Sequence, residues 1–256
     1  MLTGPVGDLI VGALGYLLGS IPFGLVLSKV AGYGDIRQIG SGNIGATNVL
    51  RTGSKKLALA VLLLDGAKGA LAVWLGAALG SAETAAFAGL AAVSGHLFPI
   101  WLRLGSARDL ASAILTLIPL VIAYWLIAAG LVGIGGAADP TGDFIRAIAT
   151  FLFLLLAIGA WGGKGVATSL GFLLAVAWPV GVLTAGTWLA MALVFRRSSL
   201  SALVAILAAP LYAYWLTDHV RVALTAVVAL MVIVRHADNI RRLVRGEEPR
   251  IQLRRA

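Results

Sequence analysis

The sequence predicts an all-α, polytopic transmembrane helix bundle, because of its composition, its apolar segments and the placement of its charges. Of the 256 residues, 60% are hydrophobic and 12% are charged, and the mean hydropathy is +0.96. Water-soluble domains are about half apolar and a quarter charged, so this chain is expected to have the lipid bilayer as its partner. The net charge of +9 could indicate nucleic acid, but the basic residues lie at the ends of apolar segments, which favours a membrane protein with no nucleic-acid partner.

Long apolar segments divide the chain, and most are near the roughly twenty residues that a spanning helix needs. They cover residues 8–31, 57–80, 84–102, 110–134, 144–161, 200–216 and 221–234. The remaining stretch, 165–195, is too long for one span and carries Pro179 at its middle. An interior proline loses a hydrogen bond and clashes with the preceding turn, so we expect two short helices that meet there. The chain is therefore expected to be one membrane domain, 1–256, with about nine crossings.

The charges give the bundle an orientation if every segment crosses and the N-terminus lies outside. The inner loops and the C-terminal tail then receive nearly all lysines and arginines. The outer side receives a set of acidic residues, with two basic exceptions: Asp8, Glu83, Asp139, Asp143 and Asp218, with Arg146 and Arg221. This separation is the positive-inside pattern, and it predicts a cytoplasmic C-terminus.

The first polar cluster is GSGNIGATNVLR, residues 40–51, between two apolar segments. Its glycines let backbone N–H groups converge on an anion, while Ser41, Asn43, Thr47 and Asn48 add further polar groups. Arg51 supplies a two-pronged positive charge for phosphate. The pattern predicts a phosphate site at a membrane surface, although an ordinary turn has a similar composition and is the alternative.

The second cluster is GGKGVAT, residues 162–168, in which Gly162, Gly163, Lys164 and Gly165 lead into a helix. Such a loop offers a phosphate N–H groups, the helix dipole and a point charge. It is not a Walker loop, because Gly165 stands where serine or threonine should follow the lysine. The alternative is a flexible turn with a snorkelling lysine.

The third cluster lies near the C-terminus, where His236 and Asn239 are three residues apart and would share a helical face. Histidine can move a proton near neutral pH, and asparagine can orient it or bind an oxyanion. An ordinary histidine at a helix end is the alternative. The predicted topology places all three clusters on the cytoplasmic side, which indicates one composite site.

Charged residues also occur inside the apolar segments. Asp65 and Lys68 lie one helical turn apart at membrane depth, where they should pair or face a polar interior, and His96 poses the same question near the inner end of its segment. A structural and a functional role both stay open for these three. We expect no metal or cofactor, because no group of carboxylates or histidines has the spacing of a ligand set.

Known catalytic motifs are missing. The sequence has no cysteine, HExxH or GxSxG, and no histidine precedes an aspartate in an HxxxxD pattern. Covalent catalysis by a triad is therefore not expected. Positioning and electrostatic stabilisation of phosphate-bearing substrates remain, with one histidine as a candidate base.

Five motifs in order carry a resemblance to a known family: GSGNIGATNVLR, LLDGAKG, GHLFPIW, GGKGVATSLG and HADNIRRLVRGEEPRI. They resemble the bacterial acyl-phosphate-dependent glycerol-3-phosphate acyltransferases (PlsY). The resemblance implies a multi-pass enzyme of the bacterial inner membrane whose active site faces the cytoplasm. It would transfer a fatty acyl group from acyl phosphate to the 1-hydroxyl of glycerol 3-phosphate, giving lysophosphatidic acid and phosphate, the first step of phospholipid synthesis.

The resemblance also carries residue roles onto this chain. Ser41 and Arg51 match the essential serine and arginine of the family's first motif, beside Asn43, Thr47 and Asn48. Residues 162–165 match the phosphate-binding glycine loop, and His236 and Asn239 match the C-terminal histidine and asparagine, with Glu248 matching a structural glutamate. The resemblance thus implies catalytic roles for Ser41, His236 and Asn239 and substrate binding by the rest of the two loops.

The sequence departs from the family in two places. Residues 105–161 form an extra stretch with two predicted crossings, an inserted helical pair that returns the chain to the same side. Trp161 replaces the first lysine of the family's KGGKG, which removes a positive charge beside the loop. Two other functions therefore stay open: a transporter of anionic or phosphorylated solutes, and an inactive member of the family. The sequence does not predict an oligomeric state.

Overall fold

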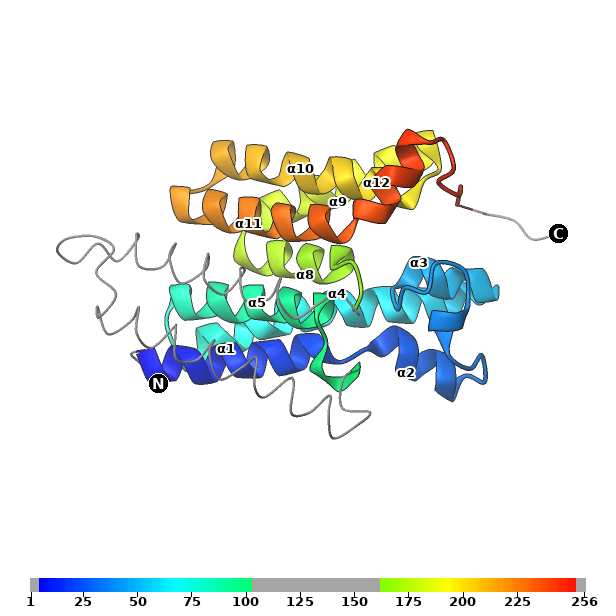
Figure 1. Ribbon diagram of the computed structural model, residues 1–256. Coiled ribbons are helices and arrows are strands. Elements are labelled where there is room, and N and C mark those ends of the chain that lie inside the picture. Colours follow the sequence, from blue (N-terminus) through cyan, green and yellow to red (C-terminus); the bar gives the residue numbers. More distant parts are fainter. Residues whose placement is uncertain (1–4, 103–161, 252–256) are drawn as a thin grey trace.

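The computed structural model describes residues 5–102 and 162–251, and in these ranges all regular structure is helical (Figure 1). The helices are α1 (Pro5–Ser20), α2 (Phe23–Val30), α3 (Ala46–Val49), α4 (Lys55–Leu79), α5 (Ala82–Leu97), α8 (Val166–Val176), α9 (Trp178–Phe195), α10 (Ser198–Leu216), α11 (His219–Arg235) and α12 (Ala237–Val244). Short 3₁₀ turns cover Ile36–Gln38, Leu50–Thr52 and Ile100–Leu102. The prediction of an all-α bundle is confirmed for these residues.

The spans agree with the apolar segments. Five helical segments of the described ranges are long and apolar enough to cross a membrane: Val6–Val30, Lys55–Leu79, Ala82–Leu102, Trp178–Phe195 and Ser198–Leu216. α11 and α12 form a further candidate that is bent by 64°. α8 has 11 residues, so it reaches about half of the hydrocarbon thickness. The predicted crossings at 110–134 and 144–161 lie outside the described residues, and the total of about nine stays a prediction.

The first segment is broken, which the apolar pattern did not indicate. α1 ends at Ser20 and α2 begins at Phe23. Pro22 between them has no N–H to donate back to the preceding turn, and its ring crowds that turn, which favours a break there. The carbonyl of Ile21 lies within this break, where it accepts from the N–H of Phe23 at 3.1 Å and from Lys68 of α4 at 3.0 Å.

The expected break near Pro179 is confirmed. α8 ends at Val176, and α9 begins at Trp178, so Pro179 lies in the first turn of α9. The missing proline N–H costs nothing there, because first-turn N–H groups have no partner within the helix. α8 and α9 pack against each other, and the chain reverses between them.

Small residues allow the helices of the bundle to approach closely. Gly15 and Gly19 of α1 face the backbone of Ala88 and Ala92 in α5, and a Cβ on either glycine would collide with it. Glycine-to-backbone contacts of the same kind join α4 to α8. Apolar side chains gain little from leaving lipid, so close backbone packing is the main source of helix association in a bilayer. α5 is the central helix and contacts α1, α4, α8 and α11.

Replacing Gly19 with alanine tests this packing. The added methyl group would overlap the carbonyl of Ala92, and overpacking of this kind costs about 1–3 kcal/mol. We expect Gly19→Ala to lower the midpoint of thermal unfolding of the detergent-solubilised protein by several degrees. The control is Gly186→Ala on α9, where a Cβ meets open space. Equal midpoints for the two variants would contradict the close approach of α1 and α5.

Candidate active site

The three polar clusters lie at the same end of the bundle. In Figure 1 this is the right-hand end, where α3 lies, where the loop before α8 enters and where α11 turns into α12. Hydrogen bonds join these segments to one another and to neighbouring helices: the hydroxyl oxygens of Thr47 and Ser198 are 3.1 Å apart, and Arg235 donates to the carbonyls of Gly162 and Gly163 at 2.8 and 3.3 Å. The clusters predicted to form one site therefore gather at one end.

Asn48 holds the first cluster together from within. Its side chain is 2% exposed, and its Nδ2 donates to the carbonyls of Ile36 and Ile39 at 2.9 Å each. Its Oδ1 accepts from the backbone N–H of Ser41 at 3.0 Å and from the Ser41 hydroxyl at 3.3 Å. An amide offers two donors and one acceptor oxygen, and all of them are in use. Asn48 therefore shapes the loop, and Ser41 is the exposed member of the pair.

Arg51 lies across Gly40. A Cβ on Gly40 would collide with the guanidinium and Cδ of Arg51, and the backbone of Gly40 has a φ of +58° that side chains rarely adopt. Glycine is therefore required there on both counts. The amide oxygen of Asn43 accepts from the N–H of Gly45 at 2.8 Å, which closes the turn. Glycine and Asn43 thus keep this loop compact beneath the arginine.

The second cluster is held by its own backbone. The N–H of Gly162 donates to Leu97 at 3.2 Å, and the N–H of Gly163 donates to His96 at 3.0 Å. Arg235 donates to the carbonyls of both glycines, at 2.8 Å for Gly162 and 3.3 Å for Gly163. We expected the whole glycine loop to offer N–H groups to a phosphate, but these two N–H groups are already used. They fix the loop to the end of α5.

The start of α8 remains available as an anion site. Gly165 precedes α8 with a φ of +81°, and no side chain caps this helix. The N–H groups of the first helical turn have no partner within the helix, and they carry the positive end of its dipole. Together with Lys164, they form the part of the glycine loop that can bind an anion.

Lys164 lies in a cationic environment. Burial lowers its pKa from 10.5 to about 8; among the nearby charges the Glu248 carboxylate acts most strongly and raises the pKa, while Arg242, Arg235 and Arg51 lower it. These charged residues come from the first cluster, from α11, from α12 and from the tail. An anion bound beside Lys164 would relieve the repulsion among the cations.

His236 is 1% exposed and lies at the junction of α11 and α12. Its Nδ1 is 2.7 Å from the carbonyl oxygen of Val232. A carbonyl can only accept, so Nδ1 carries the hydrogen in this contact. In the neutral ring the lone pair is then on Nε2, which is the form that can accept a proton from a hydroxyl.

Asn239 anchors the tail. Its Nδ2 donates to Glu248 at 2.6 Å, and Arg242 donates to the other carboxylate oxygen at 2.7 Å. Burial is the largest single influence on the pKa of Glu248 and raises it, but Ser199, Asn239 and Arg242 together hold it below its ordinary value. We expected Asn239 to orient His236, but the histidine ring instead contacts the carbonyl of Val232.

Asp65, Lys68 and His96 form one buried cluster. The Lys68 ammonium lies 2.8 Å from Asp65 and 2.7 Å from Nδ1 of His96. All three side chains are at most 4% exposed. The expected pairing of Asp65 with Lys68 is confirmed, and His96 belongs to the same cluster.

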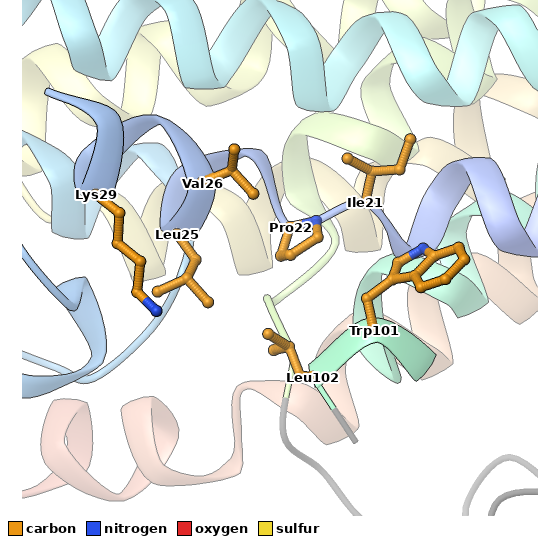
Figure 2. A pocket seen from close by; sticks show the side chains of 7 residues that line it. All are labelled: Ile21, Pro22, Leu25, Val26, Lys29, Trp101 and Leu102. Atoms are coloured by element: carbon orange, nitrogen blue, oxygen red, sulfur yellow. The ribbon is translucent and has the colours of Figure 1, made fainter. Parts of the chain in front are cut away.

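An apolar groove lies beside the break between α1 and α2 (Figure 2). It has a volume of about 450 Å³ and is open on one side. Its walls are apolar apart from one lysine, and they consist of Ile21, Pro22, Leu25, Val26, Lys29, Trp101 and Leu102. This shape and chemistry suit an alkyl chain with an anionic group near one end.

Three contributors to the site were not recognised in the sequence. Arg235 fixes the glycine loop, Arg242 holds Glu248, and Ser198 contacts Thr47. Both arginines have the ordinary appearance of basic residues at the inner end of a span. One feature of the sequence could have indicated a role for Arg235: it directly precedes His236, a candidate site residue.

Comparison with known proteins decides the family. The family model described as glycerol-3-phosphate acyltransferase matches residues 9–159 and 153–246. The chain belongs to this family. A glycerol-3-phosphate acyltransferase of Paramagnetospirillum magneticum is 48% identical over 237 residues, covering 93% of this chain and 90% of the relative. One from Rhodospirillum rubrum is 45% identical over 245 residues, covering 93% and 88%.

Solved structures of the family share the fold. A crystal structure of PlsY (YgiH), an integral membrane glycerol 3-phosphate acyltransferase, in its glycerol 3-phosphate form is 29% identical with a TM-score of 0.69, and the match covers 96% of each chain. The lysophosphatidic acid form of PlsY gives a TM-score of 0.67 at 29% identity, covering 95% of this chain and 94% of the other. The resemblance predicted from five sequence motifs is thereby confirmed at the level of the family.

Proposed function

We propose that this protein transfers a fatty acyl group from acyl phosphate to the 1-hydroxyl of glycerol 3-phosphate. The products are lysophosphatidic acid and inorganic phosphate. Membership of the family gives the acceptor substrate, and one observation about the site supports the chemistry. The positive charges of Arg51 in the first loop, Arg235 at the end of α11 and Arg242 in α12 all lower the pKa of Lys164. A reaction between two phosphate-bearing substrates needs such a concentration of positive charge in one place.

The proposed acyl transfer needs no cofactor, because the bond that forms and the bond that breaks both belong to the two substrates. The oxygen of the 1-hydroxyl attacks the acyl carbonyl carbon, a new ester bond forms, and the bond from that carbon to the phosphate oxygen breaks. The hydroxyl proton has two possible acceptors, Nε2 of His236 and the departing phosphate. Arg51, Lys164 and the first turn of α8 neutralise the two phosphates, and Ser41 orients one of them. Asn48 acts through Ser41, because its own amide is fully engaged.

The acyl chain would occupy the groove at the α1–α2 break. Its apolar walls can accept a hydrocarbon chain, and its opening lets the chain enter from the side (Figure 2). Lys29 adds a positive charge to a lining that is otherwise apolar. Each buried methylene group contributes about 0.8 kcal/mol, so a long acyl chain would supply much of the binding energy for the donor.

The active site would face the cytoplasm of a bacterium, with the N-terminus outside and the C-terminus inside. Exposed Arg241 and Arg245 lie at the end of the bundle that carries the site. The opposite end carries the acidic Asp218, and Trp215 there is 83% exposed. Excess arginine at one end favours the cytoplasm, and exposed tryptophan near a helix end is typical of the membrane interface.

We interpret residues 105–161 as an inserted helical pair within a single domain, 1–256. The family model matches the chain in two stretches, 9–159 and 153–246, and the first of them runs through most of this segment. A transporter is disfavoured, because it would need a substrate site near the bilayer midplane. The charged residues in the middle of α4, Asp65 and Lys68, are instead paired with each other.

An activity assay tests the proposed function. Purified protein given palmitoyl phosphate and glycerol 3-phosphate is expected to release phosphate and form lysophosphatidic acid in equal amounts. Arg51→Ala should lower kcat/KM at least about 100-fold, because it removes charge stabilisation at a transferring phosphate. The control is Lys55→Ala, which removes an exposed cation nearby. Phosphate release without lysophosphatidic acid, or a normal Arg51→Ala enzyme, would overturn the proposal.

The pH dependence of substrate binding tests the role of Lys164. Because its pKa is lowered to about 8, the ammonium is charged below that pH and neutral above it. The substrate phosphate is already dianionic above about pH 7. We expect KM for glycerol 3-phosphate to rise about tenfold from pH 7 to pH 9, as the charged fraction of Lys164 falls.

Lys164→Arg is the matched control for this pH profile, because a guanidinium stays charged throughout that range. Its KM is expected to be nearly constant from pH 7 to pH 9. A rise as steep as that of the parent would assign the pH dependence to another group.

A further inference from the structure

The buried cluster of Asp65, Lys68 and His96 is not used by the chemistry proposed above, yet it lies directly behind the glycine loop. Lys68 has three N–H donors, and three partners surround it: Asp65 at 2.8 Å, Nδ1 of His96 at 2.7 Å and the carbonyl of Ile21 at 3.0 Å. The ring of Phe23 lies 5.8 Å from the ammonium. One side chain of α4 thereby connects the α1–α2 break with the end of α5.

His96 transmits this connection to the glycine loop in two ways. It lies in the last turn of α5, where carbonyl groups have no partner within the helix. Its carbonyl accepts from Gly163 at 3.0 Å, and the next carbonyl, of Leu97, accepts from Gly162 at 3.2 Å. Its ring also lies against Gly163, where a Cβ would collide with Nε2 and the neighbouring ring carbons.

The orientation of the His96 ring follows from its partner. A lysine ammonium only donates, so Nδ1 of His96 accepts the contact from Lys68 and the ring hydrogen is on Nε2. The Nε2 side is the one that meets Gly163. Lys68 therefore determines which edge of the imidazole faces the loop.

A purely stabilising role would not explain this arrangement. Burying a charged pair at membrane depth is costly, and an apolar pair of similar size is often as stable or more stable. The charged cluster instead fixes the positions of its three side chains, because hydrogen bonds and ion pairs form only at particular distances and directions. α8 begins at Val166, three residues after Gly163. A shift of His96 would therefore also shift the first turn of α8, which is the anion-binding turn.

We propose that Asp65, Lys68 and His96 are positioning residues, which hold the Gly162–Gly165 loop and the start of α8 in place for the substrate phosphate. This inference rests on the proposed function for its effect on catalysis. Its structural part, the support of the loop by His96, can be tested without activity. A displacement of about 1 Å at a catalytic group can cost about 100-fold in rate, so the effect should be measurable.

Amide hydrogen exchange of the full-length protein tests the structural part. His96→Leu removes the acceptor for Lys68, and the peptide that covers residues 162–168 is expected to exchange at least about tenfold faster than in the parent. His96→Asn keeps an oxygen near the position of Nδ1 and should restore most of the protection. Ser94→Ala is the control, because Ser94 is also buried in α5 but its hydroxyl donates to Leu90 of the same helix.

Kinetics of the same variants test the effect on the site. We expect His96→Leu to raise KM for glycerol 3-phosphate about tenfold or more, and His96→Asn and Ser94→Ala to stay within about threefold of the parent. If His96→Leu does not fold, the isosteric Asp65→Asn replaces it and is expected to change KM in the same direction.

Two results would overturn the positioning role: unchanged exchange of the loop in a folded His96→Leu or Asp65→Asn protein, or equal impairment of His96→Asn and His96→Leu. A parent protein that makes no lysophosphatidic acid would contradict the proposed function instead. The exchange of the loop peptide would still report on the support by His96 in that case.

Discussion

The burial of Lys164 among charged side chains is the constraint on which the site depends. Burial and the nearby Arg51, Arg235 and Arg242 all disfavour its charged form, and Glu248 compensates only in part. Such a group is poorly satisfied by the protein alone and becomes favourable when an anion binds. The rest of the cytoplasmic end supports this environment: Arg235 also fixes the glycine loop, and Arg242 also fixes Glu248.

A rigid backbone makes that charge useful. The backbone groups of Gly162 and Gly163 form hydrogen bonds with the end of α5 and with Arg235. The side-chain amide of Asn48 forms hydrogen bonds with backbone carbonyls of the first loop. Neither loop therefore needs to become ordered when a substrate binds, which reduces the entropic cost of binding. Catalysis then rests on positioned charge, and a nucleophilic side chain is not required.

The sequence alone predicted the membrane class, the break near Pro179 and the gathering of three clusters at one end, because hydropathy and charge act locally along the chain. It did not indicate the α1–α2 break, since the apolar pattern continues through Pro22. It also missed the use of the Gly163 N–H and the role of Arg235. Their partners are more than sixty residues away in sequence, so only the packing of α5, α8 and α11 brings them together.

The central claim is that Arg51 of the first loop and Lys164 of the second bind substrate in one site. The most direct measurement is the affinity for glycerol 3-phosphate, by calorimetric titration of the parent, Arg51→Ala, Lys164→Ala and the double variant. If both cations act on one site, the two losses in binding free energy should be non-additive, with a coupling of about 0.5–3 kcal/mol. Losses that add within error would mean that the two residues act independently and would contradict the composite site.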